Sequence, residues 1–399
     1  MTNTPISNYV NMELKIRNFG PIKKADIDFG HLTFLIGPQA SGKSLSLELL
    51  KLIIDKQHII STLRNYNYIL SKTDARNILE WYFGEGLSAL FKEETQISWT
   101  DNLFTPQDLL KTISRQKASE VQKESVFYVP AQRILSISDG RPKNFMEYDV
   151  SNPYVLRRFS EILRIFMQGG LGNPDTIFPM RNRLKGSIRK SIKDTIFHDG
   201  KVVLDKTGEQ RKMKLEIDEM RIPFMAWSAG QKEFMPLLLA IYCLSGPPTQ
   251  VINKSDYQWV IIEEPEMGLH PRAIQSVLLE IIELVQSGYR VVVSTHSVTF
   301  LEFVWAFKNL QSLSDEDFKA AMCEIFDIRT STTAANLFDR LKEKTIKTFY
   351  SAEQFSENGV TFADISSLDA FSENTNISEW GGLSSFAGKS SDIVSRYGK

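Results

Sequence analysis

The sequence predicts an α/β protein built on a mostly parallel sheet with flanking helices. Two short apolar runs, residues 259–262 and 290–294, are joined by a helical pattern over residues 272–286. A third apolar run at residues 32–36 precedes a leucine-rich helical pattern at residues 45–52. Continuous apolar runs indicate strands buried on both faces, and a helix between two such strands indicates that they pair in parallel.

The N-terminal end adds antiparallel strands to this core. Apolar and polar residues alternate over residues 12–16 and again over residues 25–29, with a turn at residues 18–21 between them. This alternation predicts an antiparallel pair of strands with one buried face. The pair leads directly into the buried strand at residues 32–36.

Two helical regions interrupt the core. Residues 46–124 are expected to form a helical insert, broken near Gly84 and Gly86, which ends before a short strand at residues 126–129. Residues 150–245 are expected to form a second, helical lobe. Its clearest helix is a stripe of period 3.6 between residues 155 and 167.

These patterns predict one large domain over residues 1–310. The lobe should also contain a hairpin, formed by residues 202–204 and 213–217. Residues 311–399 are expected to form a C-terminal helical region followed by a tail rich in Ser and Gly. Because apolar residues interrupt this tail, it is interpreted as a docking segment.

Composition excludes several classes of protein. The chain has 399 residues, 42% hydrophobic content and a net charge of -1, so bulk charge indicates no particular partner. No apolar run reaches the ~20 residues of a membrane helix, and no signal-peptide pattern opens the chain, so we expect a cytoplasmic protein without a membrane partner. Cys243 and Cys323 are isolated, which predicts buried thiols and no structural metal.

A complete phosphate-binding pattern lies between the strand at residues 32–36 and the helix that follows it. It consists of Gly37, Pro38, Gln39, Ala40, Ser41, Gly42, Lys43 and Ser44. The glycines allow backbone N–H groups to point at phosphate oxygens, Lys43 can reach the terminal phosphates, and the Ser44 hydroxyl can ligate Mg²⁺. The strand before the pattern and the helix after it make an ordinary glycine turn the weaker interpretation.

Two carboxylates follow the apolar run at residues 259–262. Glu263 can hold Mg²⁺, and Glu264 can polarise an attacking water. The carboxyl end of a buried parallel strand is where such sheets collect ligands. A solvated acidic loop is the alternative, and the four apolar residues before it disfavour that reading. Glu266 is interpreted as structural.

Three weaker patterns lie in the right order to complete such a site. Small residues at a helix start can bind an anion, and here they are Ser228, Ala229, Gly230 and Gln231. Gln132 follows the strand at residues 126–129 and can sense Mg²⁺ and water, while Arg133 is expected to form an ion pair. His296 ends the strand at residues 290–294 and can contact the terminal phosphate, although a lone histidine is usually structural.

Taken together, these residues resemble the ABC-type ATPases, and specifically the soluble branch that includes RecF, the SMC proteins and the OLD-family ATPases. The segments LKIRNFG at residues 14–20 and EEPEMGLHP at residues 263–271 are similar to that branch's opening strand and to its Walker B and D-loop. The resemblance covers residues 12–310 apart from the helical insert. It implies an ABC-type P-loop NTPase core with ATP and Mg²⁺ as cofactors.

The resemblance also implies a role for each motif. It assigns Walker A to residues 37–44, Mg²⁺ ligation to Ser44, Gln132 and Glu263, catalysis to Gln132, Glu264 and His296, and the signature to residues 228–231. In ABC-type proteins the signature of one subunit closes over the ATP of the other. The resemblance therefore implies an ATP-dependent dimer of this chain that opens after hydrolysis.

Five positions depart from the pattern of that branch. Gln39 stands where Asn is usual, and Glu263 replaces the commoner Asp, which is one methylene shorter. The signature contains Trp227 and Ala229 in place of Leu and Gly, and Pro236 lies early in the helix that follows. These departures bear on the rate of hydrolysis more than on ATP binding.

The biological role remains open between three hypotheses. In the first, a compact ATPase works with a separately encoded effector, a nuclease or toxin, in anti-phage defence, and its tail at residues 380–383 is available for docking. The second is a RecF-like DNA-repair ATPase that binds nucleic acid through a basic cluster, although Ile188 and Ile192 make a solvated amphipathic helix equally consistent. The cluster comprises Arg181, Arg183, Lys185, Arg189, Lys190 and Lys193. The third is an ATP-gated scaffold with little hydrolysis.

Overall fold

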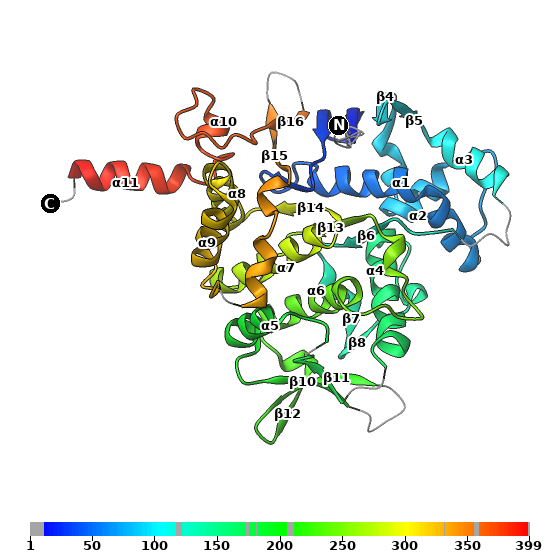
Figure 1. Cartoon of the computed structure of the whole chain (residues 1–399). Coiled ribbons are helices and arrows are strands. Elements are labelled where there is room, and N and C mark those ends of the chain that lie inside the picture. The colour runs from blue at the N-terminus through cyan, green and yellow to red at the C-terminus, as the bar shows by residue number, and fades with distance from the viewer. Residues whose placement is uncertain are drawn as a thin grey trace, which may run out of the picture.

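The computed structural model describes residues 12–116, 122–172, 175–180, 182–205, 211–330, 332–354 and 359–397. In these residues a ten-stranded sheet forms the core, in the order β5-β4-β1-β2-β16-β15-β3-β14-β13-β6 (Figure 1). Its strands are β1 (Glu13–Phe19), β2 (Ile22–Asp28), β3 (Leu32–Ile36), β4 (Phe91–Trp99), β5 (Asn102–Phe104), β6 (Val126–Val129), β13 (Trp259–Glu263), β14 (Arg290–Thr295), β15 (Ile346–Gln354) and β16 (Gly359–Asp364).

The central strands of this sheet are parallel. β6, β13, β14, β3 and β15 pair in parallel in that order, and β1 and β2 form the predicted antiparallel pair. The α/β class with N-terminal antiparallel strands is therefore confirmed. Because parallel strands end at the same edge, the residues that follow β3, β6, β13 and β14 all meet at one edge of the sheet.

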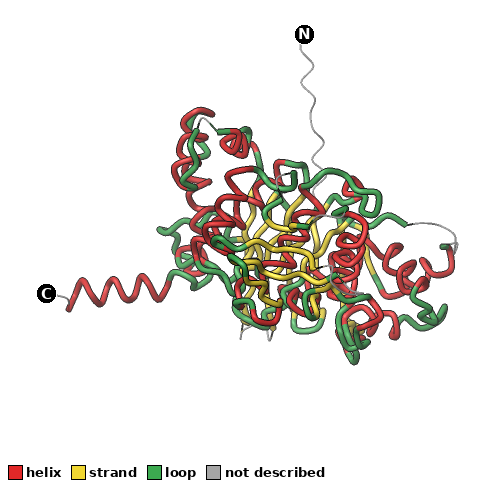
Figure 2. Tube along the Cα trace, turned by 90° about the horizontal axis from the view of Figure 1, so that it is seen from below, coloured by secondary structure: helices red, strands yellow, loops and turns green. Residues whose placement is uncertain are grey.

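Helices cover both faces of the core sheet (Figure 2). Successive buried residues of β3 alternate between two apolar clusters: Phe34 belongs to one cluster and Leu35 to the other. The helix α1 (Lys43–Asn65) packs into the cluster of Leu35, and α6 (Ala229–Ser245), α7 (Pro271–Gln286) and α8 (Val298–Leu310) pack into the cluster of Phe34. This arrangement explains why these strands are apolar without alternation.

The insert contains strands as well as helices, which corrects the prediction for residues 46–124. α1 is followed by α2 (Arg76–Phe83) and, after Gly84 and Gly86, by β4, which pairs with β1 and carries β5 on its other side; α3 (Pro106–Arg115) follows. The residues of β4 are mostly polar and at least partly exposed, so its sequence carries no strand periodicity. It is a strand because β1 offers it a free edge.

The lobe at residues 150–245 contains a second, four-stranded sheet beside its helices. The predicted helix is α4 (Tyr154–Ile165), and the predicted hairpin is β10 (Lys201–Asp205) with β11 (Lys212–Ile217). The turn between them falls outside the described residues. The lobe also contains β9 (Thr176–Phe178), α5 (Gly186–Ile192) and β12 (Met220–Pro223), while the two-stranded sheet of β7 (Ile137–Ser138) and β8 (Arg141–Pro142) precedes it in the chain.

The C-terminal region differs most from its prediction. It contains α9 (Asp315–Ile325), α10 (Thr375–Ser378) and α11 (Ser385–Tyr397), but β15 and β16 lie inside the core sheet between β3 and β2. The domain boundary predicted at residue 310 is therefore wrong, because the core sheet is incomplete without residues 346–364. In the tail, Trp380 and Leu383 pack against the core of their own chain.

Two further expectations concern the cysteines and membrane-spanning helices. Cys243 and Cys323 are free and buried, as predicted. No helix in the described part of the chain combines the length and apolar character that crossing a membrane requires.

Candidate functional site: a phosphate loop facing a pair of carboxylates

The phosphate loop connects β3 to α1 and is shaped by β15. Gly37 has a φ of 145°, and a Cβ there would lie 2.1 Å from the carbonyl oxygen of Ser351. Gly42 caps α1 with a φ of 77°. The hydroxyls of Ser41 and Ser351 are hydrogen-bonded at 2.7 Å. Both glycines are therefore required by the backbone, and a strand from the far end of the sequence holds the loop in place.

Lys43 is folded across this loop. Its Nζ donates to the carbonyl oxygens of Gly37 at 2.8 Å and Pro38 at 2.7 Å, and its side chain is only 5% exposed. Burial lowers the pKa of Lys43, while the nearby carboxylates of Glu264 and Glu263 oppose that shift. The partners of the buried ammonium in these two bonds are thus neutral carbonyl oxygens. A charged phosphate oxygen is a stronger acceptor than these carbonyl oxygens.

Ser44 and Glu263 meet at the end of β13. The Ser44 hydroxyl donates to Oε2 of Glu263 at 2.7 Å, and the phenol of Tyr128, on neighbouring β6, donates to Oε1. Burial raises the pKa of Glu263, although the hydrogen bonds from Tyr128 and Ser44 work against that shift. A nearby cation would favour its ionised form.

The donor set at this point fits Mg²⁺. A hydroxyl and one carboxylate are the oxygen ligands by which nucleotide-binding proteins hold Mg²⁺ together with substrate phosphates. Among the described residues no group of three or more His, Cys, Asp or Glu could hold a metal by itself. The residues present therefore fit a Mg²⁺ that arrives with a nucleotide, held by Ser44 and Glu263.

Glu264 is paired with His296. Its Oε1 lies 3.1 Å from Nε2 of His296, and this hydrogen bond is the main reason that the pKa of Glu264 is lowered. Its backbone has a φ of 42°, and its N–H donates to the carbonyl of Ser294 at 2.8 Å, so the residue is turned toward β14. The pair can hold Glu264 ionised and oriented as a proton acceptor.

Glu266 has a structural position, as predicted. One of its oxygens accepts from the Thr295 hydroxyl at 2.7 Å and from the His296 N–H at 2.6 Å. These bonds fasten the loop after β13 to the end of β14. Glu266 thereby fixes the backbone that carries His296.

Arg133 connects the carboxylates to the lobe. Its fully buried guanidinium donates to the carbonyl oxygens of Glu263 at 3.0 Å, Glu264 at 3.1 Å and Glu233 at 3.0 Å, the last of these on α6. Its expected role as an ion-pairing residue is therefore minor, because the Glu233 carboxylate lies 4.0 Å away. Gln132, in contrast, is exposed at the start of the turn after β6.

The signature segment begins α6. Ser228 is the N-cap: its Oγ accepts from the N–H of Gln231 at 3.3 Å, and the Gln231 side chain accepts from the N–H of Ser228 at 3.2 Å. A Cβ on Gly230 would lie 2.5 Å from the carbonyl oxygen of Gly268, in the loop after Glu264. The signature is thus packed against the segment that follows the carboxylates, while Ser228 and Ala229 are exposed.

The departures in the signature have a packing explanation. Trp227 is 4% exposed, and its indole N–H donates to the carbonyl of Ile222 at 3.1 Å, so the ring belongs to the core of the lobe. Pro236 lies within α6 and is buried. Neither residue removes the exposed N–H groups at the start of the helix.

Sequence reasoning missed three residues of this site. Tyr128 donates a hydrogen bond to Glu263, and Ser351 shapes the phosphate loop. Glu48 is a buried carboxyl, and both its burial and the charge of Glu263 raise its pKa. A tyrosine within an otherwise apolar strand was the available signal for Tyr128, since a buried phenol needs a partner. Ser351 carried no signal, because its strand was not predicted.

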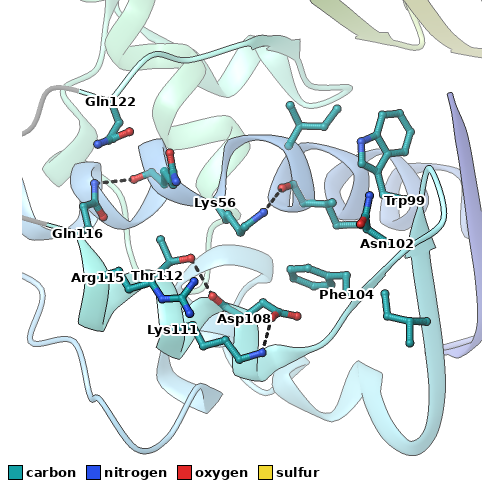
Figure 3. Close-up of a pocket in the computed structure, with 14 residues that line it drawn as sticks. Lys56, Trp99, Asn102, Phe104, Asp108, Lys111, Thr112, Arg115, Gln116 and Gln122 are labelled. Atoms are coloured by element: carbon teal, nitrogen blue, oxygen red, sulfur yellow. Dashed lines mark hydrogen bonds and ion pairs between the residues drawn. The ribbon is translucent and has the colours of Figure 1, made fainter. Parts of the chain in front are cut away.

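A cavity of about 590 Å³ lies elsewhere, on the insert (Figure 3). Lys56 of α1, Trp99 and Phe104 of β4 and β5, and Lys111 and Arg115 of α3 line it. The Lys111 ammonium is paired with Asp108 at 2.9 Å. None of the residues that line it belongs to the phosphate loop or follows β13, so the cavity is not assigned to the site.

A phosphate loop, a hydroxyl beside a buried carboxylate and a second carboxylate held by histidine, all at the carboxyl edge of a parallel sheet, define a P-loop ATPase domain of the ABC type. Residues 32–302 match the family described as "AAA domain, putative AbiEii toxin, Type IV TA system". Because this match spans more than half of the chain, the protein belongs to that family.

Individual relatives are more distant. The Old nuclease of Escherichia phage P2 is 27% identical over 124 residues, which are 31% of this chain and 20% of that protein, so the chain spans about a fifth of its length. The match to the structure of the SMC head bound to the C-winged helix domain of ScpA covers 89% of this chain and 97% of that chain, at 10% identity and a TM-score of 0.37. The match to the SMC head domain from Thermotoga maritima covers 89% of this chain and 98% of that domain, at 11% identity and a TM-score of 0.36.

Proposed function

We propose that the protein binds Mg²⁺–ATP at the phosphate loop and hydrolyses it in a site that a second copy of the chain completes. The observation that carries this proposal is the convergence of Lys43, the Ser44–Glu263 pair and the Glu264–His296 pair at one sheet edge. Bound Mg²⁺ supplies charge neutralisation for the terminal phosphates. Every other task falls to side chains and backbone N–H groups of the protein.

Each side chain has a task that its geometry supports. Lys43 exchanges its carbonyl partners for phosphate oxygens, and Ser44 and Glu263 orient the metal. Glu264 accepts the proton of the attacking water, since its lowered pKa keeps it ionised at neutral pH. His296 holds Glu264 in place and contacts the γ-phosphate, and Gln132 completes the ligands on its exposed turn.

Completion in trans is supported by the start of α6. Ser228 and Ala229 are exposed at the N-terminus of a 17-residue helix, where free N–H groups and the helix dipole favour an anion. Arg133 and the Gly230–Gly268 contact join this helix start to the backbone of Glu263 and Glu264. A change at the helix start when the γ-phosphate of the other copy is lost would therefore reach the carboxylates of the helix's own chain.

Regulation of a separately encoded effector, in anti-phage defence, is the role that we propose for this cycle. The family description refers to a toxin of a toxin–antitoxin system, and an OLD-type nuclease is among the relatives. Both names refer to a toxic or nucleolytic activity. Co-purification of the full chain with the product of a neighbouring gene tests this role, and an ATPase that purifies without any such partner would argue against it.

The basic cluster gives little support to the RecF-like alternative. Arg183 is buried and donates to three carbonyl oxygens, and Lys185 is paired with Glu283 at 3.3 Å. Lys190 and Lys193 are paired with Asp194 and Asp199. Arg181 lies outside the described residues. Arg183 therefore has a structural role, and the three lysines form ion pairs within the protein. For this reason a phosphate-binding surface is not proposed.

The Glu264→Gln variant tests hydrolysis and dimerisation together. We expect turnover to fall by about 10²–10⁴-fold, the usual contribution of a general base, while ATP and Mg²⁺ raise the mass of the variant above its nucleotide-free value in light scattering. Glu93→Gln is the matched control, because Glu93 is an exposed carboxylate on β4. Wild-type protein that binds ATP without turnover would favour the scaffold hypothesis instead.

A further inference from the structure

An apolar groove lies on the side of the molecule formed by α7, α8 and α9. Its volume is about 510 Å³, and its apolar lining includes Leu278, Phe303, Trp305, Ile325, Phe326 and Trp380. Trp305 is 45% exposed and Ile325 is 40% exposed, and these exposed fractions are high for large apolar side chains. The floor of the groove is well packed, since Trp380 and Trp305 have ring centroids 6.5 Å apart.

Helix α11 is the counterpart of this groove. It extends away from the body of the molecule in both views (Figures 1 and 2). Phe386 is 81% exposed, Val394 66% and Tyr397 79%, and Ile393 is exposed as well. At 100° per residue these four positions fall on one face of the helix. A 13-residue helix is marginal by itself in water, so this apolar face needs a partner.

We propose that α11 of one copy of the chain lies in the α7–α9 groove of a second copy. The two surfaces match in character, because the apolar stripe of α11 faces an apolar floor. They also match in charge: the exposed Lys389 borders the stripe on α11, and the exposed Glu302 borders the groove on α8. The groove volume lies within the range that encloses several side chains.

This contact is separate from the ATP-dependent one. It uses neither the phosphate loop nor the signature at Ser228–Gln231, so it can join copies in the absence of nucleotide. It is nevertheless close to the site in the chain, since α7 begins three residues after Gly268 and α8 begins two residues after His296. A neighbour bound in the groove therefore contacts the two helices that carry the loops after β13 and β14.

Disulfide trapping between two differently tagged versions of the full chain tests the proposal. One version carries Val394→Cys on the apolar face of α11, and the other carries Ile325→Cys in the groove. Both native cysteines are buried, so the introduced thiols are the exposed ones among the described residues. Both versions also carry Lys43→Ala, which removes nucleotide-driven association and makes the result independent of the proposed ATPase function.

We expect a disulfide-linked dimer that contains both tags. Ser395→Cys, on the opposite face of α11, is the matched control and should give at least tenfold less. Absence of a mixed-tag product overturns the proposal. So does a chain carrying both cysteines that closes the disulfide within itself, because α11 would then occupy the groove of its own chain.

Light scattering of nucleotide-free protein gives a second, independent readout. The wild-type chain should have a mass above that of one copy, and Phe386→Asp combined with Val394→Asp should reduce it to one copy. Ser395→Asp should leave the mass unchanged, because it adds a negative charge to the face opposite the apolar stripe. A wild-type chain that is monomeric without nucleotide, or a double variant that keeps the wild-type mass, contradicts the proposal.

Discussion

Two lysines on the same helix, about two turns apart, have opposite environments. Lys43 begins α1, and its ammonium bonds carbonyl oxygens of the phosphate loop. Lys51 is buried further along, and its ammonium bonds the carboxylates of Glu124 at 2.8 Å and Asp55 at 3.1 Å. Burial lowers the pKa of Lys43, whereas at Lys51 the two carboxylates outweigh burial and raise it.

The difference separates a ligand-binding lysine from a structural one. Glu124 also accepts from Arg158 at 2.8 Å, and Asp55 accepts from the N–H groups of Ser125 and Val126, so the charges around Lys51 are satisfied within the protein. This cluster fixes the start of β6 to α1. Around Lys43 the carboxylates belong to the end of β13 and the loop after it, and a triphosphate can take the place of the carbonyl partners of Lys43.

Loss of Lys51 should have the largest effect on stability. The Lys51→Met variant leaves two buried carboxylates without their ammonium, and removing one partner of such a cluster costs about 3–5 kcal/mol of unfolding free energy. Urea unfolding followed by circular dichroism measures this change. Lys72→Met, which alters an exposed lysine, is the control and should change little. Equal stabilities for the two variants would remove the contrast drawn between Lys43 and Lys51.

Loss of Lys43 should instead weaken ATP binding. Hydrogen bonds to charged groups contribute about 1.5–3 kcal/mol each, so Lys43→Ala should reduce ATP affinity by about 10²-fold in calorimetric titrations. Its effect on unfolding should be much smaller than that of Lys51→Met. A variant that binds ATP like the wild type, or that unfolds as readily as Lys51→Met, would show that both lysines are structural.

Acid should destabilise the Lys51 cluster through Glu124. Although burial opposes its charge, Arg158 and Lys51 hold the pKa of Glu124 well below the ordinary value of 4.5. A lowered pKa contributes stability above the unfolded value, and that stability is lost as the pH falls through the folded value.

Below about pH 4.5 the wild-type unfolding free energy should therefore decrease more steeply than that of Glu124→Gln. The difference should approach, and not exceed, about 1.4 kcal/mol per pH unit for this one group. Chemical denaturation at a series of pH values measures it. Parallel curves for the two proteins would mean that Glu124 has the same pKa folded and unfolded.

Tyr128 should have the smallest effect and act only through the metal. Tyr128→Phe keeps the ring and removes the donor on Glu263, and loss of such an outer contact reduces metal affinity by about tenfold. We expect ATPase activity to require more Mg²⁺, with maximal turnover restored at high Mg²⁺. A lower maximal rate without any change in the Mg²⁺ requirement would assign Tyr128 a different role.

The sequence predicted those parts of the fold whose signals are local. Strands buried on both faces, such as β3 and β13, are continuous apolar runs, and the loop and carboxylates follow directly from them. β4 and β15 were missed because the first is polar and the second was assigned to a helical region. Tyr128, Ser351 and Arg133 act through strands and helices that are distant in the sequence, so only the sheet order brings their partners into reach.

Mixing two inactive variants tests the central claim, a site shared between two copies. Lys43→Ala removes the phosphate lysine, and Ser228→Asp keeps an N-cap oxygen for α6 while placing a negative charge against the phosphate. Each variant alone should lack ATPase activity, and Ser228→Asn, which caps the helix without the charge, is the control. Random pairing makes half of the dimers mixed, and each mixed dimer contains one intact composite site, so an equal mixture should recover about a quarter of wild-type turnover. A mixture that stays inactive would mean that Lys43 and Ser228 serve the same site within one chain, which contradicts the account.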